Sequence, residues 1–472
     1  MHNKREKIIQ LIFKLVLLFI LIQPLFDVLS FLDIRQIIPV GISTYVKPIF
    51  VFGIGLVLLF LTEQKRILWI LYWGVFGIYA IIHCLMLLNV GVLLNTVLHE
   101  ARFIINIMYM NMFFMDMWMI YSYMKGKKEF KENLQKVLFW VTIIYSGCVL
   151  LTSVLGVSAR TYEYSDANKL GLKGIFDSGQ ILGHVLSILF LFSLAYLREK
   201  KMPLWVKLVI IAIPTAVMWN LGTKVPYFMT IICSIVFIMI EIFVCIQKKK
   251  RISTFILIPV IIMVTMLCTI QYSPVQHNIS LNATVGQIDI DSYDIDKITG
   301  LDEYRDIDLD ELHKSEMSEK EKFLEWDLIA KEYLREQIEK GVVHPSAQRQ
   351  KQKTFNIKKY ELVDWKYKIM GIGYLSSDST LTLESDVLMT VFCFGVFGFL
   401  MMLGLIIVST FKVGIKMLIN IREQTPLTLG SMVGMFAFLG VSYTAGYTYI
   451  YTNFSIFLVC LVFVLKANVE KN

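Results

Sequence analysis

Long apolar stretches alternate with short polar connections along most of the chain. A helix that crosses a lipid bilayer needs about 20 mostly apolar residues, and many of these stretches reach that length. We therefore expect an all-α, polytopic integral membrane protein with about twelve transmembrane helices. The predicted spans lie near residues 8–30, 44–62, 67–88, 103–124, 136–156, 181–197, 203–221, 226–246, 252–271, 387–410, 428–445 and 450–466.

Basic residues recur in every second connection between these spans. Connections on the cytoplasmic side of a membrane carry an excess of lysine and arginine, so this alternation predicts the orientation. We expect both termini to be cytoplasmic. The basic connections hold Lys4, Arg5 and Lys7; Lys65 and Arg66; Lys125, Lys127, Lys128 and Lys131; Arg198, Lys200 and Lys201; the run from Lys248 to Arg251; and Lys412, Lys416 and Arg422.

One long polar segment, 272–386, interrupts the series of spans and falls on the outer side. We predict an extracytoplasmic loop domain there, between membrane domains at 1–271 (about nine helices) and 387–472 (about three helices). Ser318 followed by Glu321 is a capping box that opens a helical apolar stripe, and Gly341 ends it. The acidic run 289–311 has few large apolar residues and is predicted to be mobile.

The composition agrees with a membrane protein and excludes several other classes. Apolar residues make up 56% of the chain and charged residues only 18%, with a mean hydropathy of +0.61. A soluble chain has about 25% charged residues, so a cytosolic enzyme, a disordered protein and a nucleic-acid binder are all excluded. The net charge of +8 hides a segregation: the segment 272–386 holds 15 basic and 23 acidic residues, so the remainder is strongly basic.

Several kinds of chemistry have no motif in this sequence. There is no cysteine and histidine cluster with metal-ligand spacing, no glycine-rich nucleotide motif and no serine-centred nucleophile elbow. We therefore expect no cofactor, no bound metal and no ATP-driven chemistry from this chain.

Cations on the predicted outer face are candidates for ligand binding because the positive-inside pattern does not explain them. Arg102 stands at the outer start of the fourth span, Arg160 lies in the next outer loop, and Lys224 lies where a span turns at the outer face. Arg349 lies in the large loop. Guanidinium groups bind phosphate oxygens in pairs, so these four residues suit a polyanionic ligand such as a lipid diphosphate.

Four stretches resemble one family of membrane proteins. Residues 174–183 (GIFDSGQILG) are similar to the segment that opens a central span in the O-antigen ligase and polymerase family, although Gln180 stands where that family usually has asparagine. Residues 222–225 (GTKV) resemble its Gly-Thr-Lys turn. Arg349 with the ending 366–374 resembles its outer-loop arginine, and 384–399 resembles its acidic pair before a glycine-rich span.

The resemblance implies a glycosyltransferase with a GT-C-like fold that uses a donor linked to undecaprenyl diphosphate at the outer face of the bacterial cytoplasmic membrane. Arg102, Arg160, Lys224 and Arg349 would then bind the donor diphosphate. Glu384 and Asp386 are the candidates for the catalytic base, with a helix-dipole role as the alternative. The expected partners are the lipid-linked glycan and membrane lipids, together with flippase and chain-length regulator proteins.

Three functions compete. The leading interpretation is a polymerase that joins lipid-linked repeat units into O-antigen, capsule or exopolysaccharide. The alternative is a ligase that transfers a finished glycan to another acceptor. A flippase or transporter ranks below both, because it predicts internal repeats and charges near the bilayer midplane.

Overall fold

The computed structural model describes residues 2–35, 42–63, 66–163, 168–285, 293–304, 317–373, 381, 383–444, 446 and 452–470. The fold is all-α, with one small antiparallel pair of strands, β1 (Ala159–Arg160) and β2 (Leu172–Gly174). The helices outside the large loop are α1 (His2–Leu21), α2 (Gln23–Ile34), α3 (Ile42–Leu61), α4 (Arg66–Asn89), α5 (Leu94–Met124), α6 (Lys128–Val154), α7 (Gly179–Glu199), α8 (Leu204–Asn220), α9 (Lys224–Gln247), α10 (Leu257–Cys268), α17 (Asp386–Ile419), α18 (Pro426–Thr444) and α19 (Thr452–Val469). The first helix of the loop segment is α11 (Pro274–Val285), which follows α10 closely.

The described part of the chain contains seven helices long and apolar enough to cross a membrane, or eight if the bent pair α1–α2 forms one span. Four shorter apolar helices occupy the other predicted spans, and they lie at Tyr45–Leu61, Leu204–Asn220, Thr254–Cys268 and Phe454–Val469. The chain is therefore an all-α multi-pass membrane protein, as predicted. The count of twelve spans stays a prediction.

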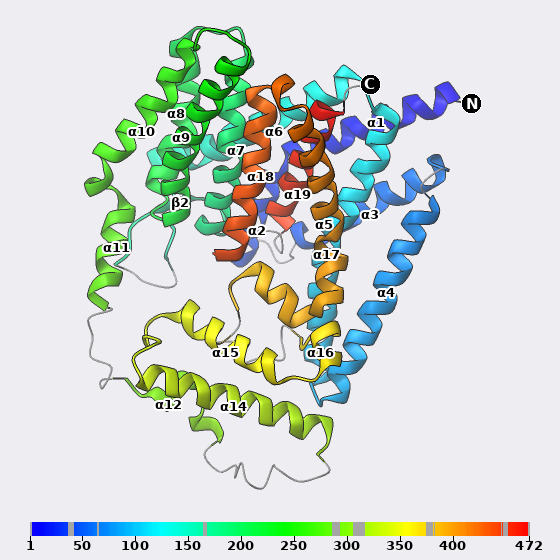
Figure 1. Ribbon diagram of the computed structural model, residues 1–472, viewed down its shortest axis with the longest axis vertical. Coiled ribbons are helices and arrows are strands. Elements are labelled where there is room, and N and C mark those ends of the chain that lie inside the picture. Colours follow the sequence, from blue (N-terminus) through cyan, green and yellow to red (C-terminus); the bar gives the residue numbers. More distant parts are fainter. Residues whose placement is uncertain are drawn as a thin grey trace.

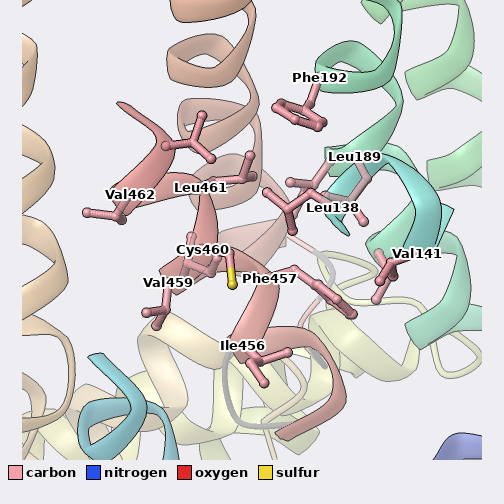
Figure 2. Close-up of a cluster of buried hydrophobic side chains, with 14 of the residues drawn as sticks. Leu138, Val141, Leu189, Phe192, Ile456, Phe457, Val459, Cys460, Leu461 and Val462 are labelled. Atoms are coloured by element: carbon pink, nitrogen blue, oxygen red, sulfur yellow. The ribbon is translucent and has the colours of Figure 1, made fainter. Parts of the chain in front are cut away.

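The helices α7 and α19 form the centre of the bundle. In the apolar part of α7, 94% of the residues are buried, because the helix is apolar on every side and is surrounded by α6, α8, α9, α18 and α19. Figure 2 shows this core, where Phe457 and Cys460 of α19 lie near Leu138 of α6 and Leu189 of α7.

The helix α17 is broken near its start. At about 1.5 Å per residue its 34 residues would extend for about 51 Å, which exceeds the apolar thickness of a bilayer. Gly395 has φ 71° and ψ 174°, so the helical hydrogen bonds are interrupted there. The freed carbonyl groups of Phe392 and Cys393 accept hydrogen bonds from the amides of Ile372 and Gly373, at 3.1 and 2.9 Å. The end of the loop is thus joined to the break in α17.

The large loop folds into a helical layer of its own. Its elements are α12 (Ile295–Thr299), a 3₁₀ turn (Asp302–Tyr304), α14 (Glu319–Glu339), α15 (Gln348–Leu362) and α16 (Trp365–Met370). Figure 1 shows these helices at one end of the molecule, while both termini lie near the opposite end. The predicted boundaries at 272 and 386 fall at the 3₁₀ turn Ile270–Tyr272 and at the first residue of α17.

The predicted loop helix is confirmed. In α14 the Ser318 side chain accepts from the Glu321 amide, and the Glu321 side chain accepts from the Ser318 amide, so the capping box is complete. The helix ends at Glu339, and Gly341 follows with φ +70°. Its apolar side packs Leu334 and Ile338 against Phe355 of α15.

The acidic run 289–311 was predicted to be mobile, and for part of it this is wrong. Residues 293–304 fold into α12 and a 3₁₀ turn, with the Asp294 side chain capping the Lys297 amide. Ile295 and Ile298 pack against the cluster of α14 and α15, which supplies apolar burial that the composition did not reveal. The rest of the run, 289–292 and 305–311, lies outside the described residues.

Candidate functional site

An ion pair joins the loop layer to the start of α17. Arg349 Nε on the first turn of α15 donates to Glu384 Oε2 at 2.7 Å. Both side chains are reachable from solvent, with 52% of the Arg349 side chain and 26% of the Glu384 side chain exposed. Glu384 lies two residues before Asp386, the first residue of α17. The pair therefore lies where loop and membrane helix meet.

Both residues of this pair line a cavity of about 230 Å³. It contains residues from α15, from the segment that enters α17, and from the end of α18. Tyr443 forms one wall: its carbonyl accepts from Ser385 Oγ at 2.7 Å, and Lys353 Nζ lies 5.6 Å from the centre of its ring. The lining residues are Arg349, Gln352, Lys353, Leu383, Glu384, Ser385, Leu388 and Tyr443.

The charges of the cavity suit an anionic ligand next to a proton acceptor. Arg349 and Lys353 supply two cations and Glu384 one carboxylate, so the lining is positive overall. Arg349 holds Glu384 through one hydrogen bond and retains further N–H donors for phosphate oxygens. The carboxylate of Glu384 is acceptor-only when ionised, as a general base must be.

The two predicted catalytic carboxylates have different surroundings. Glu384 lines the cavity, whereas Asp386 is buried, with 2% of its surface exposed, and is not among the lining residues. Asp386 is the first residue of α17, where a carboxylate complements the helix dipole. Of the two, only Glu384 is positioned to meet a ligand in this cavity.

Gly446 holds the backbone of Glu384 in place. A Cβ on Gly446 would lie 1.3 Å from the Glu384 carbonyl oxygen, so no other residue fits there without moving the chain. Gly446 also has φ +65°, which disfavours any side chain. Gly446, two residues after the end of α18, thus lies in close contact with the backbone of Glu384.

A second segment, the β1–β2 hairpin, is hydrogen-bonded to the residues before α9. Asn278 of α11 joins the two: its side chain donates to the carbonyls of Leu170 and Gly222, at 2.7 and 2.8 Å. Thr161 Oγ1 donates to the Leu221 carbonyl at 2.8 Å. These bonds hold the β1–β2 hairpin, and with it Arg160, beside the turn that carries Lys224.

Tyr162, which follows β1, lies within electrostatic range of Arg349. Burial raises the pKa of Tyr162, and the charge of Arg349 acts in the opposite direction, so the two side chains are close enough to interact electrostatically. Lys169 Nζ lies 5.3 Å from the centre of the Tyr162 ring. The hairpin therefore lies within electrostatic range of the first turn of α15, which carries Arg349.

Of the four residues predicted to bind the donor diphosphate, one lines the cavity. Arg349 lines the cavity, whereas Arg160 and Lys224 are exposed and are not lining residues. Arg102 lies in α5, and its side chain is outside the described residues. The loop histidine His344 accepts from the Ser346 amide at 3.2 Å and is not a lining residue either.

Sequence reasoning missed Lys353 and Tyr443. Lys353 follows Arg349 by four residues, which places both on one side of α15, so helical spacing was a usable signal. Tyr443 had no local signal. It reaches the site only because α18 ends beside α17.

Taken together, the apolar helices and the ionic cavity at the loop end define a multi-pass membrane protein with an anion-compatible site at one membrane face. The family model described as O-antigen ligase like membrane protein matches residues 10–472, and the chain therefore belongs to that family. A comparison with curated proteins finds no match, and neither does a comparison with solved structures.

Proposed function

We propose that this protein joins oligosaccharide repeat units carried on undecaprenyl diphosphate into a surface polysaccharide. The family membership supports a glycan-processing role in a membrane. The observation that carries the finer proposal is the cavity in which two cations, Arg349 and Lys353, lie beside one carboxylate, Glu384. Transfer from a lipid diphosphate needs this combination: cations for the leaving group and a base for the acceptor.

The reaction proposed is a single glycosyl transfer. The acceptor hydroxyl gives its proton to the Glu384 carboxylate while its oxygen bonds to the anomeric carbon of the donor sugar. The bond from that carbon to the diphosphate oxygen breaks, and the electron pair leaves with the lipid diphosphate. Arg349 and Lys353 stabilise the negative charge that develops there, and Arg160, Lys224 and Arg102 extend the positive surface toward the arriving donor.

Arg349 has two roles in this scheme. Without donor it pairs with Glu384. A donor diphosphate competes for the same guanidinium, and as Arg349 turns toward phosphate the carboxylate of Glu384 becomes free to accept a proton. Donor binding would thereby activate the base.

The site is proposed to face outward from the bacterial cytoplasmic membrane, with both termini cytoplasmic. The alternation of basic connections supports this orientation. A cysteine introduced at Glu336, on the exposed side of α14, is expected to react with a membrane-impermeant thiol reagent in intact cells. A cysteine at Lys250 is expected to react only after permeabilisation. The reverse pattern would contradict the orientation and the outer-face chemistry.

A ligase is the second candidate, and the name of the family favours it. Both enzymes would share donor and site, and they differ in the acceptor. In proteoliposomes with purified lipid-linked repeat units as the only substrate, a polymerase gives a ladder of longer lipid-linked chains. A ligase gives no ladder and transfers glycan only when another acceptor is added. No consumption of the donor under either condition would contradict the proposed function. Flippase and chain-length regulator proteins are the proposed partners in cells.

A further inference from the structure

Two buried side chains fasten α4 to the break in α17. The hydroxyl of Tyr79 donates to the Phe394 carbonyl at 2.7 Å, and His83 Nδ1 lies 2.8 Å from the Met370 carbonyl oxygen. Tyr79 is 1% exposed and His83 is fully buried. Elsewhere α4 is largely exposed, so these bonds secure its loop end to α16 and α17, which it meets in Figure 1.

The backbones of α16 and α17 touch at this point. A Cβ on Gly371 would lie 2.1 Å from the Cys393 carbonyl oxygen, and a Cβ on Gly395 would lie 2.1 Å from the Ile369 carbonyl oxygen. The chain can cross so closely only because both residues are glycine. Met370, the acceptor for His83, lies between the two contacts.

His83 also contacts Glu100 of α5, and the two side chains share a hydrogen bond. A carbonyl oxygen can only accept, so His83 Nδ1 carries a hydrogen. His83 Nε2 lies 3.3 Å from Glu100 Oε1, and both side chains are almost completely buried. A hydrogen bond between these atoms needs one proton, either on Nε2 or on the carboxyl group. In both forms, the imidazole is held by two partners and is fixed in one orientation.

The contact between the end of α16, at Met370 and Gly371, and the break in α17, at Gly395, is called the junction. It supports both halves of the proposed site. Tyr360 of α15 stacks on Phe392 of α17 with ring centres 4.5 Å apart, and its hydroxyl donates to the Lys368 carbonyl at 3.2 Å. Arg349 lies on the same helix as Tyr360, and Glu384 lies two residues before the first residue of α17. A shift of α16 against the break would therefore change the position of α15 relative to Glu384.

We propose that His83 and Glu100 are positioning residues, which hold Met370 against the break in α17 and so set the geometry of the Arg349–Glu384 site. This inference rests on the proposed function for its catalytic consequence, but its structural part does not. Other titratable groups at the junction, among the residues described, are Tyr79 and Cys84 of α4, Cys393 of α17 and Lys359 of α15.

The structural part is tested by hydrogen–deuterium exchange of the full-length protein in nanodiscs. The reporters are the amides of Ile372 and Gly373, which donate to carbonyls of α17. His83→Ala is expected to speed their exchange about tenfold or more, because the local opening free energy falls. Glu100→Ala is expected to act in the same direction, since Nε2 loses its partner. His83→Asn keeps a donor near the Nδ1 position and is expected to restore protection.

The matched control is His99→Ala, because His99 lies one residue before Glu100 but is exposed. It is expected to leave exchange and transfer unchanged. In the transfer assay, His83→Ala is expected to lower kcat about 100-fold with little change in KM, as a misplacement of about 1 Å does, and His83→Asn to recover most of it.

Each outcome decides one part of the inference. Unchanged exchange in His83→Ala overturns the junction, and faster exchange with normal kcat overturns the positioning role. If exchange responds as expected while the unmodified protein transfers no glycan, the junction is supported and the proposed function fails.

Discussion

Arg349 and Glu384 form a 2.7 Å ion pair between the first turn of α15 and the residue pair that leads into α17. The two residues are 35 positions apart, and the rest of α15 and all of α16 lie between them. An ion pair at an exposed site contributes little to stability. Because the pair lines a cavity together with Lys353 and Tyr443, a role in ligand binding is favoured instead.

Arg349→Lys is expected to impair transfer although the charge is kept, and Arg349→Ala to impair it more. Lysine offers a point charge where the guanidinium binds two phosphate oxygens at once. Loss of one preorganised donor at a developing anion costs on the order of 100-fold in rate. The measurement is product formed from purified lipid-linked repeats at matched protein levels, with Arg335→Ala as the control in an exposed ion pair of α14. Near-normal turnover of both Arg349→Ala and Arg102→Ala would show that these arginines are structural.

Glu384→Gln is expected to abolish most transfer while the protein remains folded, because the amide cannot take the acceptor proton. Asp386→Asn is expected to retain more activity and to lower stability instead, since Asp386 is buried at the start of α17. Initial rates and melting temperatures of both variants are measured in the same detergent. A larger catalytic loss in Asp386→Asn than in Glu384→Gln would exchange the two assignments.

Gly446→Ala is expected to reduce transfer strongly. The added Cβ would collide with the Glu384 carbonyl oxygen, and a side chain at φ +65° costs about 1 kcal/mol or more in addition. Gly147→Ala is the matched control, because a Cβ there meets nothing within 4 Å. Rates at equal amounts of folded protein separate the two. Equal rates would mean that Gly446 does not position Glu384.

The loop layer is expected to lose stability at low pH through Asp327. Burial alone would raise the pKa of Asp327, but the charges of Lys359 and Lys331 lower it below its ordinary value. A carboxyl whose pKa is lowered by folding stabilises the fold fully above its unfolded-state pKa of about 4, and this contribution disappears as the pH falls through the lower folded value.

Asp327→Asn is therefore expected to destabilise the loop at neutral pH, by about 3 kcal/mol, because Lys359 and Lys331 are 1% exposed and would lose their counter-charge. The stability of the loop is measured by the protection of its amides from hydrogen–deuterium exchange, from pH 7 to pH 3. The exposed variant Glu339→Gln is the control and should stay within about 0.5 kcal/mol. A pH dependence that is the same in Asp327→Asn as in the unmodified protein would assign the acid sensitivity to another group.

Two buried aspartates are expected to respond in opposite ways to replacement by asparagine. Asp27 contacts Lys47 Nζ at 3.4 Å and accepts from the Tyr145 hydroxyl, so Asp27→Asn leaves a buried cation without its counter-charge and should cost about 3 kcal/mol or more. Asp116 is 1% exposed and neither of its carboxyl oxygens has a hydrogen-bond partner among the described residues. Asp116→Asn removes an ionisable group and should be neutral or stabilising. Thermal unfolding in matched detergent compares them, and a similar loss in both would contradict the distinction.

The sequence alone predicted those features of the structure whose physical cause lies within a short stretch of the chain. Transmembrane helices were predictable because in lipid a span of about 20 apolar residues must satisfy its own backbone hydrogen bonds. The start of α14 was predictable because Ser318 and Glu321 cap each other within four residues. Arg349 was a candidate for a related reason: it stands where the positive-inside pattern gives no cause for a cation.

The composition of the site depended on the tertiary structure. Glu384 and Asp386 are two residues apart and look equivalent in the sequence, yet one lines a cavity and the other is buried. Lys353 and Tyr443 join Arg349 there only because the beginning of α15 and the end of α18 both lie beside the start of α17. The crossing of Gly371 and Gly395, with His83 and Glu100 behind it, likewise joins residues far apart in the chain. Such contacts arise from the packing of whole helices, which depends on all of their apolar faces together, so no local stretch of sequence encodes them.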